Sequence, residues 1–166
     1  MNNNDILRRI RYTFNYNDNQ VSELFSLGGK EDVTSETVTL WLKKDEDEEQ
    51  KSLYDVELAA FLNGMIIKLR GKKGDESPKA EKSLNNNIIF RKIKIALNLR
   101  DTDIMEIFDI AKFDVSKHEI SAIFRNPTQN QYRQCKDQFL RNFLLGLQYK
   151  HRNKLKTEGS KKPSED

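Results

Sequence analysis

The sequence contains two related copies of one segment, and this internal repeat constrains the fold more than any other feature. Asn2-Asn3-Asn4 recurs as Asn85-Asn86-Asn87, an offset of 83 residues that falls to 82 after a one-residue deletion in a loop. About one in four aligned positions between residues 2 and 70 and their counterparts is identical. The identical pairs include Ile6 and Ile89, Arg8 and Arg91, Asn15 and Asn98, Phe25 and Phe108, Asp55 and Asp137, Gly64 and Gly146, and Arg70 and Arg152. The chain is therefore expected to fold as two copies of one structural unit.

Each copy is predicted to form four helices, because its apolar residues recur at the spacing of a helix face. Gly28-Gly29 marks the end of the second helix, and a capping box from Ser116 to Glu119 marks the start of the seventh. No segment shows the alternation typical of a strand, so the predicted class is all-α. The stripes of the first copy are Ile6, Leu7, Ile10 and Phe14; Val21, Leu24, Phe25 and Leu27; Val38, Trp41 and Leu42; and Val56, Ala59, Leu62, Met65 and Leu69.

The predicted architecture is two homologous four-helix repeats with pseudo-two-fold symmetry, packed through their apolar fourth helices. Residues 1–70 form the first repeat and residues 84–154 the second, while residues 71–83 read as a flexible linker and residues 155–166 as a disordered tail. A unit of this size is marginal alone, so mutual burial is expected.

Two repeated pairs are predicted to have structural roles. Gly64 and Gly146 lie inside the most apolar helices, where glycine costs about 0.5–1 kcal/mol relative to alanine, so another backbone is expected to pass close by. This neighbour is either the other fourth helix or an adjacent helix. Asp55 and Asp137 share helical spacing with apolar residues, and a carboxylate there needs a partner. A structural ion pair is expected in each copy, with Lys51 and Arg133, or Arg8 and Arg91, as the candidate partners.

Composition excludes several classes of function. The single cysteine, Cys135, rules out an internal disulfide framework, and two isolated histidines do not indicate a metal cluster. No apolar run approaches the roughly 20 residues that span a bilayer, and the N-terminus lacks the profile of a secretory signal. These features predict a cytoplasmic protein. No cofactor motif is present, and no metal or membrane partner is expected.

With the two copies aligned, motifs at residues 2–8, 41–44 and 61–64, and at residues 85–88, 135–141 and 143–147, resemble those of the YehS-like family of small bacterial proteins of unknown function. The resemblance implies a duplicated domain and a bacterial cytoplasmic setting. Since the family has no established activity, it implies no catalytic residue. The resemblance rests on residues 2–8, on Trp41-Leu42-Lys43-Lys44 with the acidic run after it, on Phe61-Leu62-Asn63-Gly64, and on Asn85–Ile88, Cys135–Arg141 and Phe143–Leu147 of the second copy.

The candidate ligand-binding residues lie mainly in the second copy. The asparagine triplets are either helix N-caps or a polar surface that holds an anion at a helix N-terminus. Basic residues that keep their sign in both copies are either solvated helix faces or a footprint for a polyanion. Residues 21–38 and 104–124 also resemble a helix-turn-helix, but the turn of about six residues is longer than expected and favours an ordinary helical hairpin. The candidates for anion or nucleic-acid binding are Asn86, Asn87, Arg91, Lys94, Lys117, His118 and Arg125.

Three functional hypotheses remain open. The leading one is a non-enzymatic, regulatory or macromolecule-binding module whose partner is a protein or a nucleic acid. The second is nucleic-acid binding through the second repeat, because residues 1–70 carry a net charge of −4 and residues 85–166 a net charge of +6. A small-molecule enzyme is the least supported class. The sequence does not indicate an oligomeric state.

Overall fold

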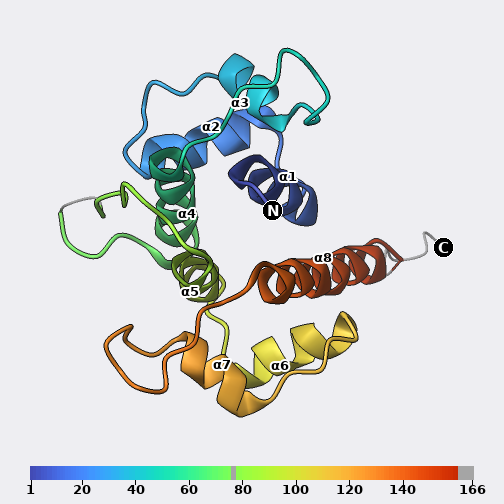
Figure 1. Cartoon of the computed structure of the whole chain (residues 1–166). Helices are drawn as coiled ribbons and strands as arrows, with labels where there is room; N and C mark the ends of the chain where they lie inside the picture. The colour runs from blue at the N-terminus through green and yellow to red at the C-terminus, as the bar shows by residue number, and fades with distance from the viewer. Residues whose placement is uncertain (76–77, 161–166) are drawn as a thin grey trace.

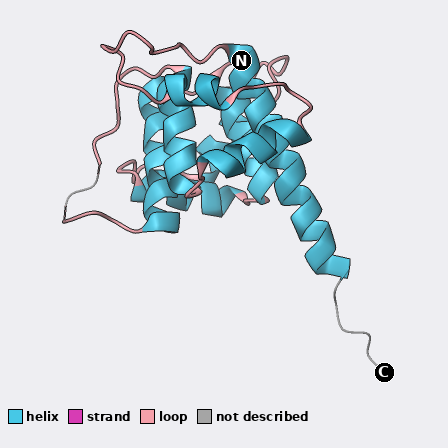
Figure 2. Ribbon diagram, turned by 90° about the horizontal axis from the view of Figure 1, so that it is seen from below, coloured by secondary structure: helices cyan, strands magenta, loops and turns pink. Residues whose placement is uncertain are grey.

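The computed structural model describes residues 1–75 and 78–160, which contain eight α-helices and no strand (Figures 1 and 2). The predicted all-α class and the two-repeat organisation are both confirmed. The helices are α1 (Asn3–Phe14), α2 (Asp18–Leu27), α3 (Ser35–Leu42), α4 (Asp55–Arg70), α5 (Asn86–Ala96), α6 (Asp101–Ile110), α7 (Lys117–Ile123) and α8 (Asp137–Ser160).

Equivalent local signals set the helix ends in both repeats. Asn2 caps α1 by accepting from the Asp5 N–H, and Asn85 caps α5 by accepting from the Ile88 N–H. Asn15 and Asn98, which follow these helices, both adopt the left-handed conformation, with φ of 55° and 52°. Asparagine tolerates this conformation better than most residues, which explains why the same residue occurs at both positions.

Within each repeat, the second helix packs against the fourth at a glycine. Gly64 of α4 lies against the backbone carbonyl of Leu24 in α2, and Gly146 of α8 lies against the carbonyl of Ile107 in α6. A Cβ atom at either glycine would overlap the carbonyl oxygen. Gly28 makes the same close approach to Ala60 from the α2 side. The backbone that passes each repeated glycine therefore belongs to the second helix of the same repeat.

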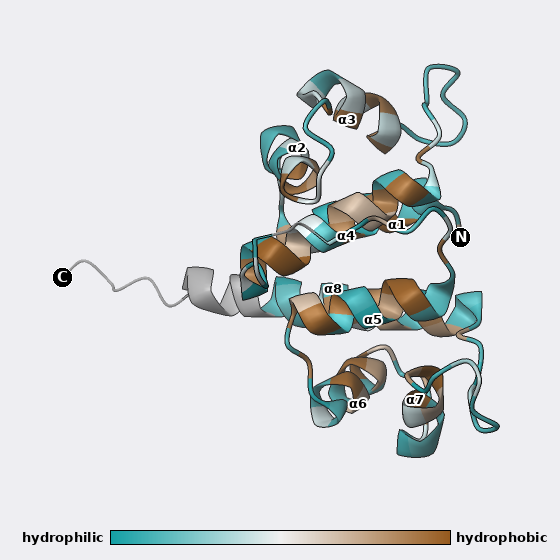
Figure 3. Ribbon diagram, turned by 90° about the vertical axis from the view of Figure 1, so that its left-hand side faces the viewer, coloured by the Kyte–Doolittle hydropathy of each residue, from teal (hydrophilic) through white to brown (hydrophobic). Residues whose placement is uncertain are grey.

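The two repeats join in a way that the sequence did not predict. The main contacts between them pair α4 with α5 and α1 with α8, so each fourth helix packs on the first helix of the other repeat. These four helices form the middle of the molecule, with α2 and α3 on one side and α6 and α7 on the other (Figure 3). The fourth helices carry the interface between the repeats, as expected, but each contacts the first helix of the other repeat instead of the other fourth helix. Every residue from Leu58 to Met65 is buried. Different faces of α4 therefore contact α2 and α5 at the same time.

A single apolar core runs through both repeats. Phe25, Trp41 and Phe61 meet in the first repeat, with ring centroids 5.0 Å and 5.3 Å from Phe25. In the second repeat, Phe90 and Phe143 contact edge to face at 4.4 Å. Since the central helices bury side chains of both repeats in one cluster, neither repeat has a separate core.

The segment between the repeats contains no helix in its described part, and the last helix is longer than predicted. Glu81 forms an ion pair with Lys92 at 2.9 Å, so the segment between the repeats contacts α5. Residues 76–77 of the predicted flexible linker lie outside the described residues. The last helix continues to Ser160, past the predicted limit of order at residue 154, because Lys, Leu and Glu extend an existing helix at low cost. The rest of the predicted tail, residues 161–166, also lies outside the described residues.

Candidate functional site

The middle asparagine of each triplet binds the first residue of a fourth helix. Asn3 Nδ2 donates to Asp55 Oδ1 at 2.7 Å and to the Leu53 carbonyl at 3.1 Å. In the second repeat, Asn86 Nδ2 donates to Asp137 Oδ1 at 2.7 Å and to the Cys135 carbonyl at 3.0 Å. Both hydrogens of each amide are therefore used to attach the first helix of a repeat to its fourth.

The third asparagine of each triplet is buried and makes three hydrogen bonds. Asn87 Nδ2 donates to the carbonyls of Ile123 and Arg133, while its Oδ1 accepts from the Cys135 N–H. Asn4 makes the equivalent bonds to Trp41, Lys51 and Leu53. Asn86 and Asn87 are candidates for anion binding, but the side-chain N–H groups of both are engaged inside the fold. The amide groups of Asn86 and Asn87 therefore serve the fold, because they satisfy backbone groups at the end of the third helix and in the loop before the fourth.

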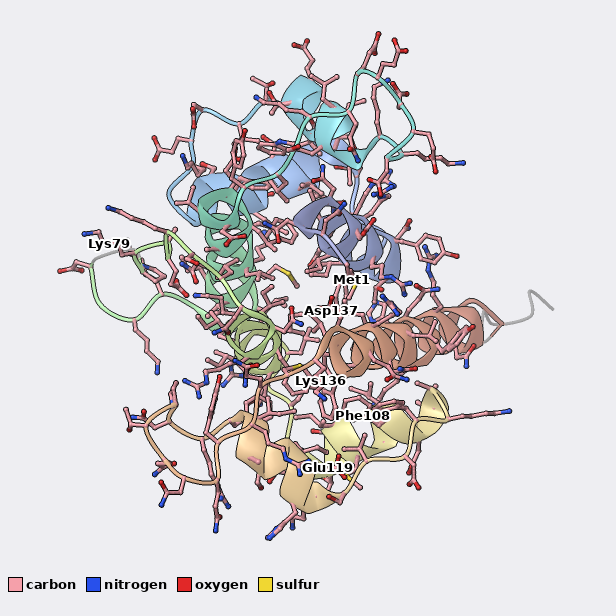
Figure 4. The ribbon with its side chains drawn as sticks, in the orientation of Figure 1. Met1, Lys79, Phe108, Glu119, Lys136 and Asp137 are labelled. Carbon is pink, nitrogen blue, oxygen red and sulfur yellow. The ribbon has the colours of Figure 1, made fainter. Side chains whose placement is uncertain are left out.

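Asp55 and Asp137 are paired with different donors than predicted. Asp55 also accepts from the Leu84 N–H at 2.9 Å, and Asp137 lies 3.4 Å from the amino terminus of Met1 (Figure 4). The predicted partners are engaged elsewhere: Lys51 lies over the Trp41 ring, Arg133 lies 3.9 Å from Glu119, Arg8 pairs with Asp5, and Arg91 donates to the Phe124 carbonyl.

The positions of these aspartates explain the difference. Asp55 and Asp137 are the first residues of α4 and α8, where a carboxylate is favoured by the helix dipole and reached by nearby N–H groups. The hydrogen bond from Asn86 and the nearby Met1 ammonium lower the pKa of Asp137 below its ordinary value. Both carboxylates therefore serve to fix a helix N-terminus.

The remaining candidates for anion binding divide into two groups. Arg91 donates to the Phe124 carbonyl at 2.8 Å, and Lys94 lies 4.3 Å from the centre of the Phe124 ring. His118 and Arg125 line a separate shallow pocket beside α7, where Arg125 donates to Gln131. Lys117 is exposed at the start of α7. The connection between α6 and α7 spans six residues and α7 has only seven, so this hairpin offers a short surface for reading a DNA groove.

A ligand-sized cleft of about 700 Å³ lies between α4 and α5 and is called the α4–α5 cleft below. Clefts of this size hold drug-sized ligands or a few side chains of a partner. Its apolar wall is aliphatic, and Ile95 within it is 46% exposed. The aliphatic residues are Ile66, Ile67, Ile88, Ile95 and Leu99.

Basic side chains surround the α4–α5 cleft. Arg70 and Lys73 form no hydrogen bond or ion pair with any residue that the structure describes. Glu81 is the one acidic residue among those that line the cleft, and Lys92 neutralises it. The cleft therefore combines an apolar wall with a net positive rim. Its basic residues are Arg70, Lys73, Arg91, Lys92 and Lys94.

A buried polar group lies in the wall of this cleft. Asn63 is 1% exposed, and its Oδ1 accepts from Lys92 Nζ at 2.6 Å. Because an ammonium group only donates, this bond identifies the other amide atom as Nδ2. Asn63 Nδ2 is buried and has no acceptor among the described residues. Lys92 in turn lies 2.9 Å from the Glu81 carboxylate, and its side chain is 13% exposed.

At the equivalent junction between α1 and α8, Arg152 covers Tyr12, and a smaller pocket of about 470 Å³ remains, lined by Met1, Asp5, Arg8, Arg9 and Arg141. Arg152 lies 3.9 Å from the centre of the Tyr12 ring and donates to the Tyr12 carbonyl at 2.6 Å. The repeat offsets of 82 and 83 align Arg152 with Arg70 and Tyr12 with Ile95. Since isoleucine offers no ring for Arg70 to stack on, the corresponding space between α4 and α5 stays open.

Sequence reasoning missed the cleft, although one signal pointed to it. Asn63 is a polar residue within an otherwise apolar run, and its counterpart in the second repeat is Leu145. This difference between copies indicates a role for Asn63 that the second repeat lacks. Lys92 and Ile95 carry no such signal. The sequence alone does not show which residues of α5 face α4 and which face solvent.

Cys135 does not have the properties of a nucleophile. Its side chain is buried, and burial together with the nearby Asp137 charge raises its pKa to about 12. No group of three or more His, Cys, Asp or Glu in the described residues could hold a metal ion. Over the same residues, no helix combines the length and apolar character needed to cross a membrane.

These features define a tandem-duplicated all-α protein. In each repeat, an equivalent Asn–Asp hydrogen bond fixes the start of the fourth helix. The chain belongs to the family described as "Protein of unknown function (DUF1456)", whose model matches residues 3–71 and again residues 86–153. It is 43% identical over 150 residues to "Uncharacterized protein YehS" of Escherichia coli (strain K12), which covers 89% of this chain and 94% of that protein. The resemblance to the YehS-like family is confirmed. No solved structure matches the chain.

Proposed function

We propose that this protein is a non-enzymatic binding module that holds an acidic, amphipathic helical segment of a partner protein in the α4–α5 cleft. The observation that carries the proposal is the pairing of an aliphatic wall with a net positive rim in a cleft of about 700 Å³. Grooves that accept amphipathic helices have this character, with apolar anchors inside and complementary charges at the edge.

The exposed residues of the cleft fit such a partner. Ile95 is 46% exposed and belongs to the aliphatic wall of the cleft, so an apolar side chain of a partner can pack on it. Arg70 and Lys73 are basic and have no acidic partner among the described residues. An apolar stripe flanked by Glu or Asp would cover the aliphatic side chains and place its carboxylates beside the free cations.

Nucleic-acid binding is the second candidate, supported by the basic character of the second repeat. Arg91 and Lys94 pack over Phe124, while His118 and Arg125 lie at another pocket, so these cations do not gather into one stripe. A polyanion footprint requires such a stripe, because each phosphate must meet a cation along a continuous path. The apolar wall of the cleft also has no role in phosphate binding.

The proposal is tested with fluorescein-labelled helical peptides that carry a leucine face and either glutamates or lysines on the opposite face. We expect the acidic peptides to raise fluorescence anisotropy with micromolar affinity, and Ile95→Asp to weaken binding at least about tenfold. Tyr54→Asp, at a 67% exposed site on the N-terminal side of α4 outside the cleft, is the matched control and should leave binding unchanged.

Two results would contradict the proposal. One is equal binding of acidic and basic peptides; the other is a failure of every acidic peptide to bind. A labelled DNA duplex is titrated in parallel at two salt concentrations. Tight binding of DNA with a steep salt dependence, and no binding of the peptides, would favour the nucleic-acid alternative.

A further inference from the structure

We infer that Lys92 and Asn63 form a carboxylate-binding point in the wall of the α4–α5 cleft, and that Glu81 occupies this point when no partner is bound. The inference deepens the proposed function, on which it rests, by naming the group of the partner that is recognised and the residues that recognise it.

The first support is the unused donor of Asn63. A buried amide N–H without an acceptor costs about 1–3 kcal/mol, so native proteins rarely keep one without a reason. Asn63 Nδ2 is such a group, it lies in a side chain that lines the cleft, and it is next to the Lys92 ammonium. A carboxylate oxygen placed here would accept from Asn63 Nδ2 and pair with Lys92 Nζ.

The second support is the carboxylate that is already present. Glu81 Oε2 lies 2.9 Å from Lys92 Nζ, and the Glu81 side chain is 34% exposed, whereas the Lys92 side chain is 13% exposed. The cation is thus held inside the wall, while its present partner reaches it from the solvent side. No hydrogen bond joins Glu81 to Asn63 among the described residues. Glu81 therefore satisfies the charge of Lys92 and leaves the second donor free.

The third support comes from the other repeat. At the offsets of the repeat, Asn63 corresponds to Leu145 and Lys92 to Arg9, so the amide donor occurs in the first copy only. A purely structural requirement shared by both repeats would be met by similar residues, as it is for the asparagine triplets. Because Leu145 replaces Asn63 at the α1–α8 junction, the recognition point occurs only at the α4–α5 junction.

A carboxylate from a partner would have to displace Glu81 from Lys92. Glu81 is covalently connected and acts at a high effective concentration, so it lowers the apparent affinity for any external carboxylate. The partner carboxylate has the advantage of a second hydrogen bond, from Asn63, together with the contacts that its apolar residues make with the aliphatic wall.

The experiment measures binding of the acidic helical peptides to the wild type and to five variants of the full chain by anisotropy. Glu81→Gln removes the internal competitor and should raise affinity about tenfold. Lys92→Met and Asn63→Leu should each lower it about tenfold, while Lys92→Arg should retain most of it. Arg9→Met, at the position equivalent to Lys92 in the other repeat, is the matched control and should have no effect. Circular dichroism melting confirms that each variant is folded.

A second measurement follows Glu81 directly. Hydrogen exchange of the amides of residues 79–84 should accelerate in Glu81→Gln, and also in the wild type on addition of peptide, because the contact with Lys92 is lost in both cases.

The two proposals fail in different ways. If no acidic peptide binds the wild type or Glu81→Gln, the proposed function is wrong, and the assignment of the carboxylate-binding point falls with it. If acidic peptides bind but Glu81→Gln binds no tighter than the wild type, or Lys92→Met binds as well as Arg9→Met, the cleft binds a partner without this recognition point, and only the inference is overturned.

Discussion

Asn86 donates a hydrogen bond of 2.7 Å to Asp137, and Asn3 donates one of the same length to Asp55 in the other repeat. Each carboxylate also meets a nitrogen at the start of the opposite repeat, Met1 for Asp137 and Leu84 for Asp55. Met1 and Leu84 are equivalent at the repeat offset of 83 residues. The aspartates therefore connect the first and fourth helices of one repeat and attach the beginning of the other.

The contacts of Asp137 predict that the wild type and Asp137→Asn differ in stability by an amount that depends on pH. Because the pKa of Asp137 is lowered in the folded protein, its contribution is present above the unfolded pKa near 4 and is lost as the pH falls below that value. We expect Asp137→Asn to be less stable than the wild type at pH 7, by less than about 1 kcal/mol since the side chain is exposed, and to converge with it towards pH 2–3.

Urea unfolding across this pH range measures the effect, with Asp109→Asn on the exposed surface of α6 as the control. A constant gap between Asp137→Asn and the wild type at all pH values would show that the carboxylate charge contributes nothing.

The buried asparagines predict two large and similar losses of stability. Asn4 and Asn87 each satisfy three backbone groups, one at the end of the third helix and two in the loop before the fourth. Asn4→Ala and Asn87→Ala should each lower the free energy of unfolding by about 2–4 kcal/mol, because they leave buried N–H and C=O groups without partners. Asn130→Ala, at an exposed loop position, should change it by less than about 0.5 kcal/mol. Denaturant unfolding measures these losses. Equal losses of unfolding free energy in all three variants would contradict this account.

The close helix crossings at Gly64 and Gly146 predict that replacing either glycine lowers the stability of the protein. In an open helix, replacing glycine by alanine stabilises by about 0.5–1 kcal/mol. At Gly64 the new methyl group would overlap the Leu24 carbonyl, so Gly64→Ala should instead destabilise by about 1–3 kcal/mol. Gly146→Leu should lower the melting temperature by several degrees for the same reason at Ile107. Calorimetry that finds either variant at least as stable as the wild type would exclude the close approach.

The raised pKa of the buried Cys135 thiol predicts that the protein becomes less stable at alkaline pH. Burial raises its pKa from 9.0 to about 12, so the native thiol stays protonated at pH values where the unfolded thiol ionises. The free energy of unfolding should therefore decrease as the pH rises from 9 towards 12, by about 1 kcal/mol at pH 10, relative to Cys135→Ala. Parallel unfolding curves at pH 7 and pH 10 isolate this contribution from other groups. A native thiol that reacts with a disulfide reagent as fast as the unfolded one would show that it is not protected.

The candidate site illustrates the limit of prediction from this sequence. Asn63 lies among apolar residues, and its counterpart Leu145 shows that the repeat does not require an amide there. Lys92 looks like any cation on a helix surface until α4 is placed beside it. Ile95 and Ile66 are ordinary members of helix stripes, and their exposure in a common cleft depends on where two helices from different repeats meet.

The sequence by itself determined the all-α class, the duplication and the ends of most helices, because apolar spacing, caps and turn residues act over a few neighbouring positions. It also indicated a close backbone contact at Gly64 and Gly146, since glycine inside an apolar helix has a local cost. Only the tertiary structure decided which helices pair across the repeats, which donors reach Asp55 and Asp137, and where the cleft opens. Those outcomes depend on contacts between residues far apart in the chain, such as Tyr12 with Arg152, and no local pattern encodes them.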